Sequence, residues 1–350
     1  MSHTTTNHAI VIEGPGSATV KTIPVPEPRE DQVRVKVSAV GLNPTDWKHI
    51  DYLASPGSIV GCDYAGVVDA VGANLTRSFN VGDRIAGVVH GSNASNKTDG
   101  AFANFIVART GAALHVPKSL SDTEAATLGV GVATVGQGLY QSLNLPLPKS
   151  SDKRTGTVLI YGGSTATGTL AIQYAKLSGW KVVATSSPHN FDLIKSLGAD
   201  HVVDYSAKDA GKQIRDYTND KLAHVFDCIS TDDSIAIAVA ALGSAGGKIS
   251  TLLDVKLPAS ADATKITVQM TLAYTAMGQA FSKFGKDFPA IPQDYKFASD
   301  FFALSQTLLE EGKLKVHPVD ARQGGLKGVL DGLDLLRKNK VSGKKLVYSV

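Results

Sequence analysis

The stretch Val158–Gly168, VLIYGGSTATG, constrains the fold of this chain more than any other. Val158–Tyr161 predicts a buried strand, a glycine-rich turn follows, and Thr169–Ser178 carries apolar residues at helical spacing. This order opens a nucleotide-binding βαβ unit, because glycines let the backbone approach a pyrophosphate and a helix N-terminus attracts that anion. The glycines do not form a strict GxGxxG pattern, so a purely structural strand–helix corner is an equal alternative for the turn alone.

The residues that follow favour the nucleotide-binding interpretation. Lys181–Thr185 predicts a second strand, Phe191–Leu197 a helix and His201–Tyr205 a third strand. Parallel strands joined by helices make half of a doubly wound sheet. Because the alternation of strands and helices continues, we expect a Rossmann dinucleotide-binding domain over residues 141–299.

The end of the second strand bears on the choice of cofactor. An NAD site places Asp or Glu there, where the carboxylate accepts from the ribose 2′-hydroxyl. Thr185, Ser186 and Ser187 occupy that place, so no carboxylate would repel a 2′-phosphate, and His189 and Asn190 add donors. The sequence therefore predicts NADPH. The same polar residues also suit the cap of the next helix, and both roles are compatible.

The N-terminal part of the chain is mostly β. Gln32–Val40, QVRVKVSAV, alternates valines with charged residues as a half-buried strand does. Short strands with closely spaced turns are typical of a small barrel-like domain. Ser121–Gln141 then predicts one alanine-rich helix, and Phe301–Glu311 an amphipathic helix. We expect a first domain over 1–140, completed by 300–350.

Composition excludes several classes of protein. The net charge of +3 is too small to indicate nucleic acid or an anionic membrane as the main partner. The chain has 2 cysteines, Cys62 and Cys228, too far apart in sequence for a metal knuckle, and no disulfide framework. No apolar run reaches the roughly 18 residues of a membrane span, and the N-terminus lacks a secretory pattern. We expect a cytoplasmic protein.

Several motifs resemble the medium-chain dehydrogenase/reductase superfamily over essentially the whole chain. They are Gly41–Lys48 (GLNPTDWK), Gly61–Gly66 (GCDYAG), Val81–Arg84 (VGDR), Gly100–Phe102 (GAF) and Val341–Leu346 (VSGKKL). The resemblance implies an α/β protein, with a Rossmann doubly wound parallel sheet and a β-rich GroES-like N-terminal domain completed by the C-terminal segment.

The zinc alcohol dehydrogenases of that superfamily carry a Cys in the first motif, a His in the second and a lobe with four cysteines. Asn43 and Cys62 stand at the first two places, and the lobe is absent. Because zinc needs several nitrogen or sulfur ligands around one point, we expect no metal. Three histidines are expected to be structural rather than ligands: His49, His90 and His317.

Within the zinc-free branch, two stretches and the C-terminal motif are similar to the fungal trans-acting enoyl reductases that partner polyketide synthases. The stretches are Tyr161–Thr167 (YGGSTAT) and Ser186–Leu193 (SSPHNFDL). Asn43–Ile50, NPTDWKHI, is also similar to zinc-free aldehyde reductases of the same branch. The second likeness keeps the substrate open.

The resemblance also implies site residues. The cofactor would contact Thr45, Asp46, Trp47 and Lys48 at the nicotinamide end, Ser164, Thr165, Ala166 and Thr167 at the pyrophosphate, Ser187, Pro188, His189 and Asn190 at the 2′-phosphate, Tyr205 at the adenine, Leu252 and Leu253 at the nicotinamide ribose, and Ser342 and Gly343 where the site closes. The substrate would contact Gly131, Val132, Ala133, Thr134, Val135, Gly136, Thr271, Leu272, Ala273, Tyr274 and Thr275. Small residues over 131–136 suit a groove for a long acyl chain, with close helix–sheet packing as the equal alternative.

Thr45, Asp46 and Lys48 are the catalytic candidates. Lys48 would donate to the cofactor ribose or relay a proton, and the alternative is a surface helix with Asp46 as a cap and Lys48 in solvent. Nothing in the sequence identifies a general acid, and water remains a source of that proton.

Without a metal, hydride transfer from NADPH to the β-carbon of an activated alkene is the easier chemistry, because the carbonyl needs only hydrogen-bond donors. We expect an NADPH-dependent, zinc-independent enoyl reductase acting on a free or carrier-bound α,β-unsaturated acyl substrate, with a polyketide synthase as a candidate partner. The alternatives are a quinone, alkenal or aldehyde reductase and a catalytically idle NADPH-binding partner of a synthase. Both a monomer and a homodimer are compatible with the sequence.

Overall fold

The computed structural model describes residues 6–152 and 154–350, so residues 1–5 of the expected first domain and residue 153 of the second lie outside it. The described chain forms two compact units. One contains the residues up to Ala133 together with Ala273–Val350, and the other is Thr134–Leu272. These limits differ from the expected 140 and 299, because helix α8 (Pro292–Glu310) packs on η1 (Thr110–Ala112) and β7 (Ala113–His115) of the first unit.

The Thr134–Leu272 unit contains a parallel six-stranded sheet in the order β10-β9-β8-β11-β12-β13. Its strands are β8 (Thr157–Tyr161), β9 (Lys181–Ser186), β10 (His201–Asp204), β11 (His224–Asp227), β12 (Gly247–Thr251) and β13 (Ile266–Met270). Val158, Leu159 and Ile160 of β8 are fully buried, as an apolar run in a strand covered on both faces must be. The predicted doubly wound sheet is confirmed.

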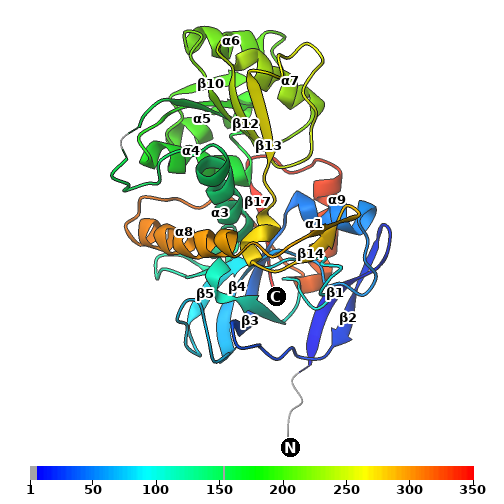
Figure 1. Cartoon of the computed structure of the whole chain (residues 1–350). Coiled ribbons are helices and arrows are strands. Elements are labelled where there is room, and N and C mark those ends of the chain that lie inside the picture. The colour runs from blue at the N-terminus through cyan, green and yellow to red at the C-terminus, as the bar shows by residue number, and fades with distance from the viewer. Residues whose placement is uncertain (1–5, 153) are drawn as a thin grey trace, which may run out of the picture. The chain divides into compact units, whose positions relative to one another are not determined.

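Helices cover both faces of this sheet. They are α4 (Ala166–Leu177), α5 (Phe191–Ser196), α6 (Ala210–Tyr217) and α7 (Asp232–Ala241). Helices α4 and α5 lie on one face, and α6 and α7, which contact each other, lie on the other (Figure 1). The sequence analysis did not predict α6, whose residues are largely polar around three buried ones.

The first unit contains a seven-stranded sheet in the order β16-β17-β3-β4-β5-β7, with β6 paired to β3. Its strands are β3 (Gln32–Gly41), β4 (Asp63–Val71), β5 (Arg84–Val88), β6 (Phe105–Arg109), β7, β16 (Val319–Arg322) and β17 (Lys345–Ser349). The valines of β3 point into the core, which confirms its alternation. Because the C-terminal strand β17 pairs with β3, the end of the chain completes this β-rich unit, as expected.

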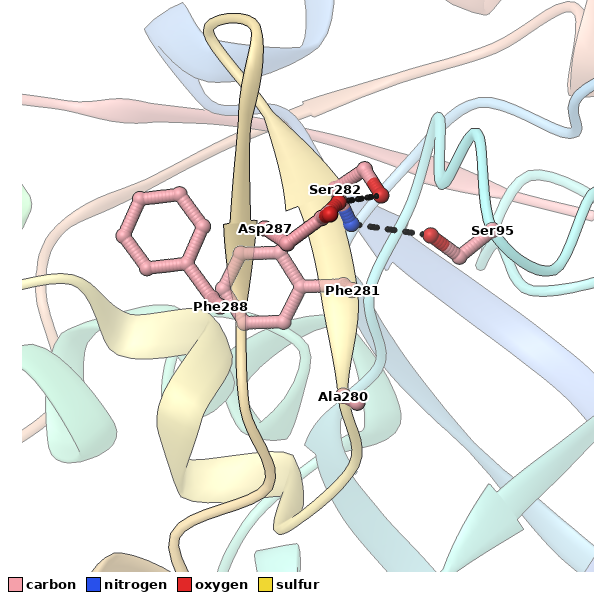
Figure 2. A pocket seen from close by; sticks show the side chains of 6 residues that line it. All are labelled: Ser95, Ala280, Phe281, Ser282, Asp287 and Phe288. Atoms are coloured by element: carbon pink, nitrogen blue, oxygen red, sulfur yellow. Dashed lines mark hydrogen bonds between the residues drawn. The ribbon is translucent and has the colours of Figure 1, made fainter.

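Smaller elements surround that sheet. They are the β1–β2 hairpin (Asn7–Gly14, Ser17–Ile23), the β14–β15 hairpin (Phe281–Lys283, Lys286–Phe288), and the helices α1 (Pro44–Tyr52), α2 (Asp122–Ala125), α8, α9 (Gly325–Arg337), η1 and η4 (Ala273–Met277). The β14–β15 hairpin was not predicted. Figure 2 shows that its Phe281 and Phe288 stack, with ring centroids 4.9 Å apart, beside a pocket of about 170 Å³.

Two helix predictions were wrong in extent. Ser121–Gln141 is not one helix but α2, α3 (Gly129–Val135) and the π-helix η2 (Gly136–Ser142). The break lies where Gly129 approaches another backbone, since a Cβ there would lie 2.1 Å from the Gly87 oxygen. Helix α8 begins before the predicted Phe301, at Pro292, and proline suits a first helical turn. Within the described residues, every helix is too short or too polar to cross a membrane.

Candidate functional site

The turn after β8 has the geometry of a nucleotide-binding corner. Gly162 has a φ of 78°, and its N–H donates to Thr185 Oγ1 over 3.0 Å. Thr165 caps α4 by accepting from the Gly168 N–H at 2.9 Å and donating to the Gly162 oxygen at 2.9 Å. The first turn of α4, which holds the predicted Ala166 and Thr167, therefore presents N–H groups that the helix itself does not use.

Two observations agree with a dinucleotide at this corner. A Cβ on Gly168 would lie 2.2 Å from the Gly162 oxygen, so the helix start is pressed against the turn as in a phosphate-binding loop. The hydroxyls of Ser186 and Thr251 are buried and have no hydrogen-bond partner among the described residues. Both stand at carboxyl ends of strands, the edge where doubly wound sheets bind ligands.

The same sheet edge exposes apolar and aromatic side chains. Tyr205 follows β10, Ile229 follows β11 and Leu253 follows β12, with exposed fractions of 44%, 39% and 39%. The hydroxyls of Tyr205 and Ser187 lie 3.1 Å apart, which brings two predicted cofactor residues together. Sequence reasoning missed Ile229. Exposed apolar side chains at this edge suit contacts with a base or a nicotinamide ring.

A buried carboxylate organises the loop after β11. Asp227 accepts from the N–H groups of Ile229 and Ser230, each at 2.9 Å, and from Ser234 Oγ at 2.6 Å. The Leu252 N–H in turn donates to Ser230 Oγ at 2.8 Å. Burial raises the pKa of Asp227. This network fixes the predicted cofactor residue Leu252, and a strand ending in Asp followed by Ser and Thr was the sequence signal for it.

The remaining predictions in this unit occupy buried or half-buried positions. Ser164–Thr167 and Ser187 are half-buried, Pro188 and His189 are exposed, and Asn190 is buried. Of the predicted substrate residues, Thr134, Val135 and Gly136 are buried, and Thr271 continues the end of β13 by donating its N–H to the Thr251 oxygen at 2.8 Å.

The first unit holds the other predicted residues. In α1, the Asn43 N–H donates to Asp46 Oδ2 at 2.7 Å, closing a capping box. Burial raises the pKa of Asp46 to about 7. The Lys48 ammonium lies 5.9 Å from the Trp47 ring centroid, and both side chains are half-buried. Asp46 is thus first of all a helix cap, which was the structural alternative for it.

Ser342 and Gly343 precede β17, and Gly343 has a φ of 63°. Gly131, Val132 and Ala133 are buried in α3, and Ala273 is half-buried in η4. Thr275, also in η4, donates its hydroxyl to Asp294 at 2.5 Å.

The most concentrated group of titratable side chains surrounds Tyr274. The Thr45 and Tyr274 hydroxyls lie 2.8 Å apart, so a catalytic candidate and a predicted substrate residue meet. The His90 ring stacks on Tyr274 at 3.9 Å, and the Lys283 ammonium lies 4.4 Å from the centroid of the same ring. Lys283 Nζ also lies 2.5 Å from His49 Nε2. We call these residues with Cys62 the Tyr274 cluster: Thr45, His49, Cys62, His90, Tyr274 and Lys283.

Burial governs the ionisation of the Tyr274 cluster. It lowers the pKa of His49 to about 4, assisted by the charge of Lys283, and lowers the pKa of His90 well below its usual range. It also lowers the pKa of Lys283 to about 8. Burial raises the pKa values of Tyr274 and Cys62. At neutral pH the histidines are therefore neutral, and the phenol and the thiol keep their protons.

Sequence reasoning missed four members of the Tyr274 cluster. His49 and His90 were interpreted as structural, Cys62 was considered only as a zinc ligand and rejected, and Lys283 lies on the unpredicted β14–β15 hairpin. One signal was available, since Thr45 and His49 are four residues apart on α1 and therefore share a helix face.

The residues at the zinc-ligand positions of the superfamily do not fit a zinc ion. Asn43 donates to Asp63 at 3.0 Å and accepts from Lys345 at 2.7 Å, and the Lys345 ammonium pairs with the buried Asp63. Cys62 keeps its proton beside Asp46. Within residues 6–152 and 154–350, no group of three or more His, Cys, Asp or Glu is placed to hold a metal. A catalytic zinc needs such a group.

Comparison with known proteins assigns both halves of this architecture. Residues 29–118 match the alcohol dehydrogenase GroES-like domain, and residues 166–281 match the zinc-binding dehydrogenase domain. A trans-enoyl reductase of Alternaria alternata is 47% identical over 99% of this chain and 99% of its own. One of Aspergillus sclerotiorum is 44% identical over 98% of this chain and 99% of its own. One of Cochliobolus carbonum is 50% identical over 78% of this chain and 91% of its own.

Solved structures share the fold. An alcohol dehydrogenase superfamily protein from Novosphingobium aromaticivorans has a TM-score of 0.83 at 23% identity, covering 99% of this chain and 100% of its own. The CurK enoyl reductase has a TM-score of 0.75 at 18% identity, covering 98% and 99%. Together with the full-length relatives, these matches confirm the resemblance seen in the sequence. The chain belongs to the medium-chain dehydrogenase/reductase superfamily of oxidoreductases, in the family of the trans-enoyl reductases.

Proposed function

We propose that this protein reduces the carbon–carbon double bond of an α,β-unsaturated acyl thioester with NADPH. The observation that carries the proposal is the near full-length match to trans-enoyl reductases, at 47% identity for the Alternaria alternata relative. Membership of this family implies a nicotinamide cofactor, and that cofactor supplies hydride when bound. The corner after β8 supports its binding, because the first turn of α4 presents N–H groups that the helix does not use.

The chain's own residues supply binding and orientation. The first turn of α4 would hold the pyrophosphate with its N–H groups. Leu252, fixed through Ser230, and the exposed Leu253 would contact the nicotinamide end. In the first unit, the Tyr274 hydroxyl, which lies 2.8 Å from the Thr45 hydroxyl, would donate its hydrogen to the substrate.

We further propose that the enoyl group is presented by the acyl carrier of a separate polyketide synthase. The word "trans" in the names of the relatives supports a partner outside the chain. The oligomeric state of the protein, monomer or homodimer, would be measured with the synthase present.

The test of this function is an NADPH-oxidation assay on a panel of acceptors. We expect turnover with a crotonyl-type thioester, faster when the acyl group is carrier-bound, and far slower turnover with quinones and aldehydes. Preferred turnover of a quinone, alkenal or aldehyde would instead assign a reductase of free small molecules. Tight NADPH binding without turnover of any acceptor would assign a catalytically idle partner.

The choice of NADPH over NADH has its own prediction. Ser187→Asp places a carboxylate beside the Tyr205 hydroxyl, where the 2′-phosphate is expected. Because like charges repel, NADPH should bind about tenfold more weakly, or ~1.4 kcal/mol, while NADH binding should hold or improve. Fluorescence titration of both coenzymes measures this. Ser187→Asn is the matched control, since it has the same shape without the charge, and equal effects of the two variants would contradict the assignment.

A further inference from the structure

We propose that Tyr274 is the proton donor of the reduction and that Lys283 resupplies its proton through His49 and Thr45. This inference rests on the proposed function, because it concerns the proton that follows the hydride. It stands on a continuous chain of hydrogen-bonding contacts within the first unit. The contacts are Lys283 to His49 at 2.5 Å, His49 to Thr45 at 3.1 Å and Thr45 to Tyr274 at 2.8 Å.

The carbonyl of Thr45 sets the direction of this chain. His49 Nδ1 lies 2.7 Å from the Thr45 oxygen, and a carbonyl oxygen can only accept, so Nδ1 carries the ring hydrogen. The opposite nitrogen, Nε2, therefore has a free lone pair. An ammonium can only donate, so Lys283 donates to Nε2. The tautomer of His49 and the direction of the first contact are thus fixed by chemistry.

The chain of hydrogen bonds continues from His49 to Tyr274. The His49 Nδ1–H also faces the Thr45 hydroxyl, which leaves the hydrogen of that hydroxyl directed at the Tyr274 oxygen. With its oxygen accepting from Thr45, the phenol offers its own hydrogen to a further acceptor. Among the described residues, the Cys62 thiol is the polar group beside the phenol, and it is a weak acceptor. Because burial raises the pKa of Tyr274 and disfavours a free phenolate, the Tyr274 proton must leave together with its replacement from Thr45.

The bound cofactor would supply hydride to the β-carbon, and the electron pair of the double bond would move toward the α-carbon and the thioester carbonyl. The Tyr274 O–H bond breaks as a C–H bond forms at the α-carbon. One proton moves at each contact, from Thr45 to Tyr274, from His49 Nδ1 to Thr45 and from Lys283 to His49 Nε2. Lys283 becomes a neutral amine and His49 is left with its hydrogen on Nε2. The resting state returns when Lys283 regains a proton from water and His49 exchanges its hydrogen back to Nδ1.

The surroundings of Lys283 suit this role. Its side chain is buried, and no ion pair between described residues includes it. The groups that face it are the neutral rings of His49 and His90, the phenol of Tyr274 and the Cys62 thiol, with the Asp46 carboxyl beyond the thiol. An ammonium without a carboxylate partner gives up a proton readily, which agrees with its lowered pKa of about 8.

The hairpin that carries Lys283 is otherwise exposed. Ser282 and Lys286 on the two strands are exposed, and Phe284 in the turn is 50% exposed. Figure 2 shows how the hairpin is held, with the Ser282 N–H donating to Ser95 Oγ at 2.9 Å and the Ser282 hydroxyl donating to Asp287 at 2.6 Å. Lys283 is therefore a buried residue on an exposed hairpin.

The first test is the pH dependence of turnover. The series of hydrogen-bonded groups can pass a proton to Tyr274 only while Lys283 is protonated. The wild-type rate should therefore fall as the pH rises through about 8, the pKa of Lys283. Lys283→Met should lower kcat about tenfold and remove that alkaline limb, with NADPH affinity unchanged. Lys283→Arg keeps the positive charge but cannot release a proton, so it should not restore the rate. Lys286→Met, on the same hairpin but exposed, should behave as wild type.

Recovery of the rate by Lys283→Arg, or an unchanged pH profile in Lys283→Met, would overturn the relay. A second readout follows the proton itself. In D2O, the wild type should place deuterium on one face of the product α-carbon, and Tyr274→Phe should place it on both faces. Retention of a single face by Tyr274→Phe would show that another group is the donor.

A third readout needs no turnover and so separates this inference from the proposed function. Nitrogen NMR of the coenzyme-free protein should show His49 with hydrogen on Nδ1 and none on Nε2. The opposite tautomer would reverse the chain and overturn the relay even in an active enoyl reductase. If the wild type reduces no enoyl thioester at all, the proposed function fails instead.

Discussion

Replacing Lys345 by Met is expected to lower the free energy of unfolding of the first unit by about 3–5 kcal/mol. The Lys345 and Asp63 side chains are 3% and 0% exposed, and they form a direct ion pair. Removing the ammonium leaves the carboxylate buried, and among the described residues its remaining donors are the Asn43 amide at 3.0 Å and the Val130 N–H at 2.5 Å. An uncompensated buried charge is costly because protein cannot solvate it as water does.

The expected loss of stability is large also because the Lys345–Asp63 pair connects segments that are distant in the sequence. Lys345 begins the C-terminal strand β17, Asp63 begins β4, and Asn43 caps α1. The pair therefore connects the end of the chain to the helix that carries Thr45. Loss of the pair should weaken the docking of β17 on β3 and lower turnover in parallel with stability.

Tryptophan fluorescence allows the first unit to be followed by itself. The chain has 2 tryptophans, Trp47 in α1 and Trp180 in the other unit, so a Trp180→Phe background reports on Trp47 alone. Urea unfolding in that background compares chains with and without the Lys345→Met substitution. Lys296→Met is the control, since its ion pair with Asp300 is exposed and should contribute less than about 1 kcal/mol. A similar small loss for Lys345→Met would contradict the prediction.

The fold could be predicted from the sequence where local pattern and tertiary environment agree. Three elements show this agreement, because their local sequence pattern matches their environment in the structure: the apolar run of β8, the alternation of β3 and the glycine turn before α4. The extent of α8 and the break after α2 could not be predicted this way. They depend on contacts between segments distant in sequence, such as Gly129 against Gly87.

The residues of the candidate site also differ in how far the sequence could predict them. Thr165, Gly168 and Ser187 belong to a contiguous motif, so their neighbourhood was predictable from spacing. The Tyr274 cluster was not, because Thr45 and Tyr274 are 229 positions apart and Lys283 is 234 positions from His49. A lone lysine in a short hairpin looks like a surface residue until the structure shows that it is buried.

Replacing Gly168 by Ala is expected to weaken NADPH binding by about 100-fold, or ~2.7 kcal/mol, and to destabilise the Thr134–Leu272 unit by about 1–3 kcal/mol. The added Cβ would lie 2.2 Å from the Gly162 oxygen and 2.8 Å from the Gly163 Cα. Both are backbone atoms, so no side chain can rotate away. Either the turn or the start of α4 must shift, and each shift moves the N–H groups that would hold the pyrophosphate.

Titration of coenzyme fluorescence and urea unfolding followed through Trp180 measure the two effects separately. Gly14→Ala is the control, since a Cβ there meets nothing within 4 Å and Gly14 lies in the other unit. The distinction matters because overpacking alone would lower stability without selectively weakening NADPH. If Gly168→Ala is destabilised but, once folded, binds NADPH as tightly as wild type, the corner after β8 serves only to pack the helix on the sheet. A loss of affinity well beyond the loss of folded protein places the coenzyme phosphates on that corner.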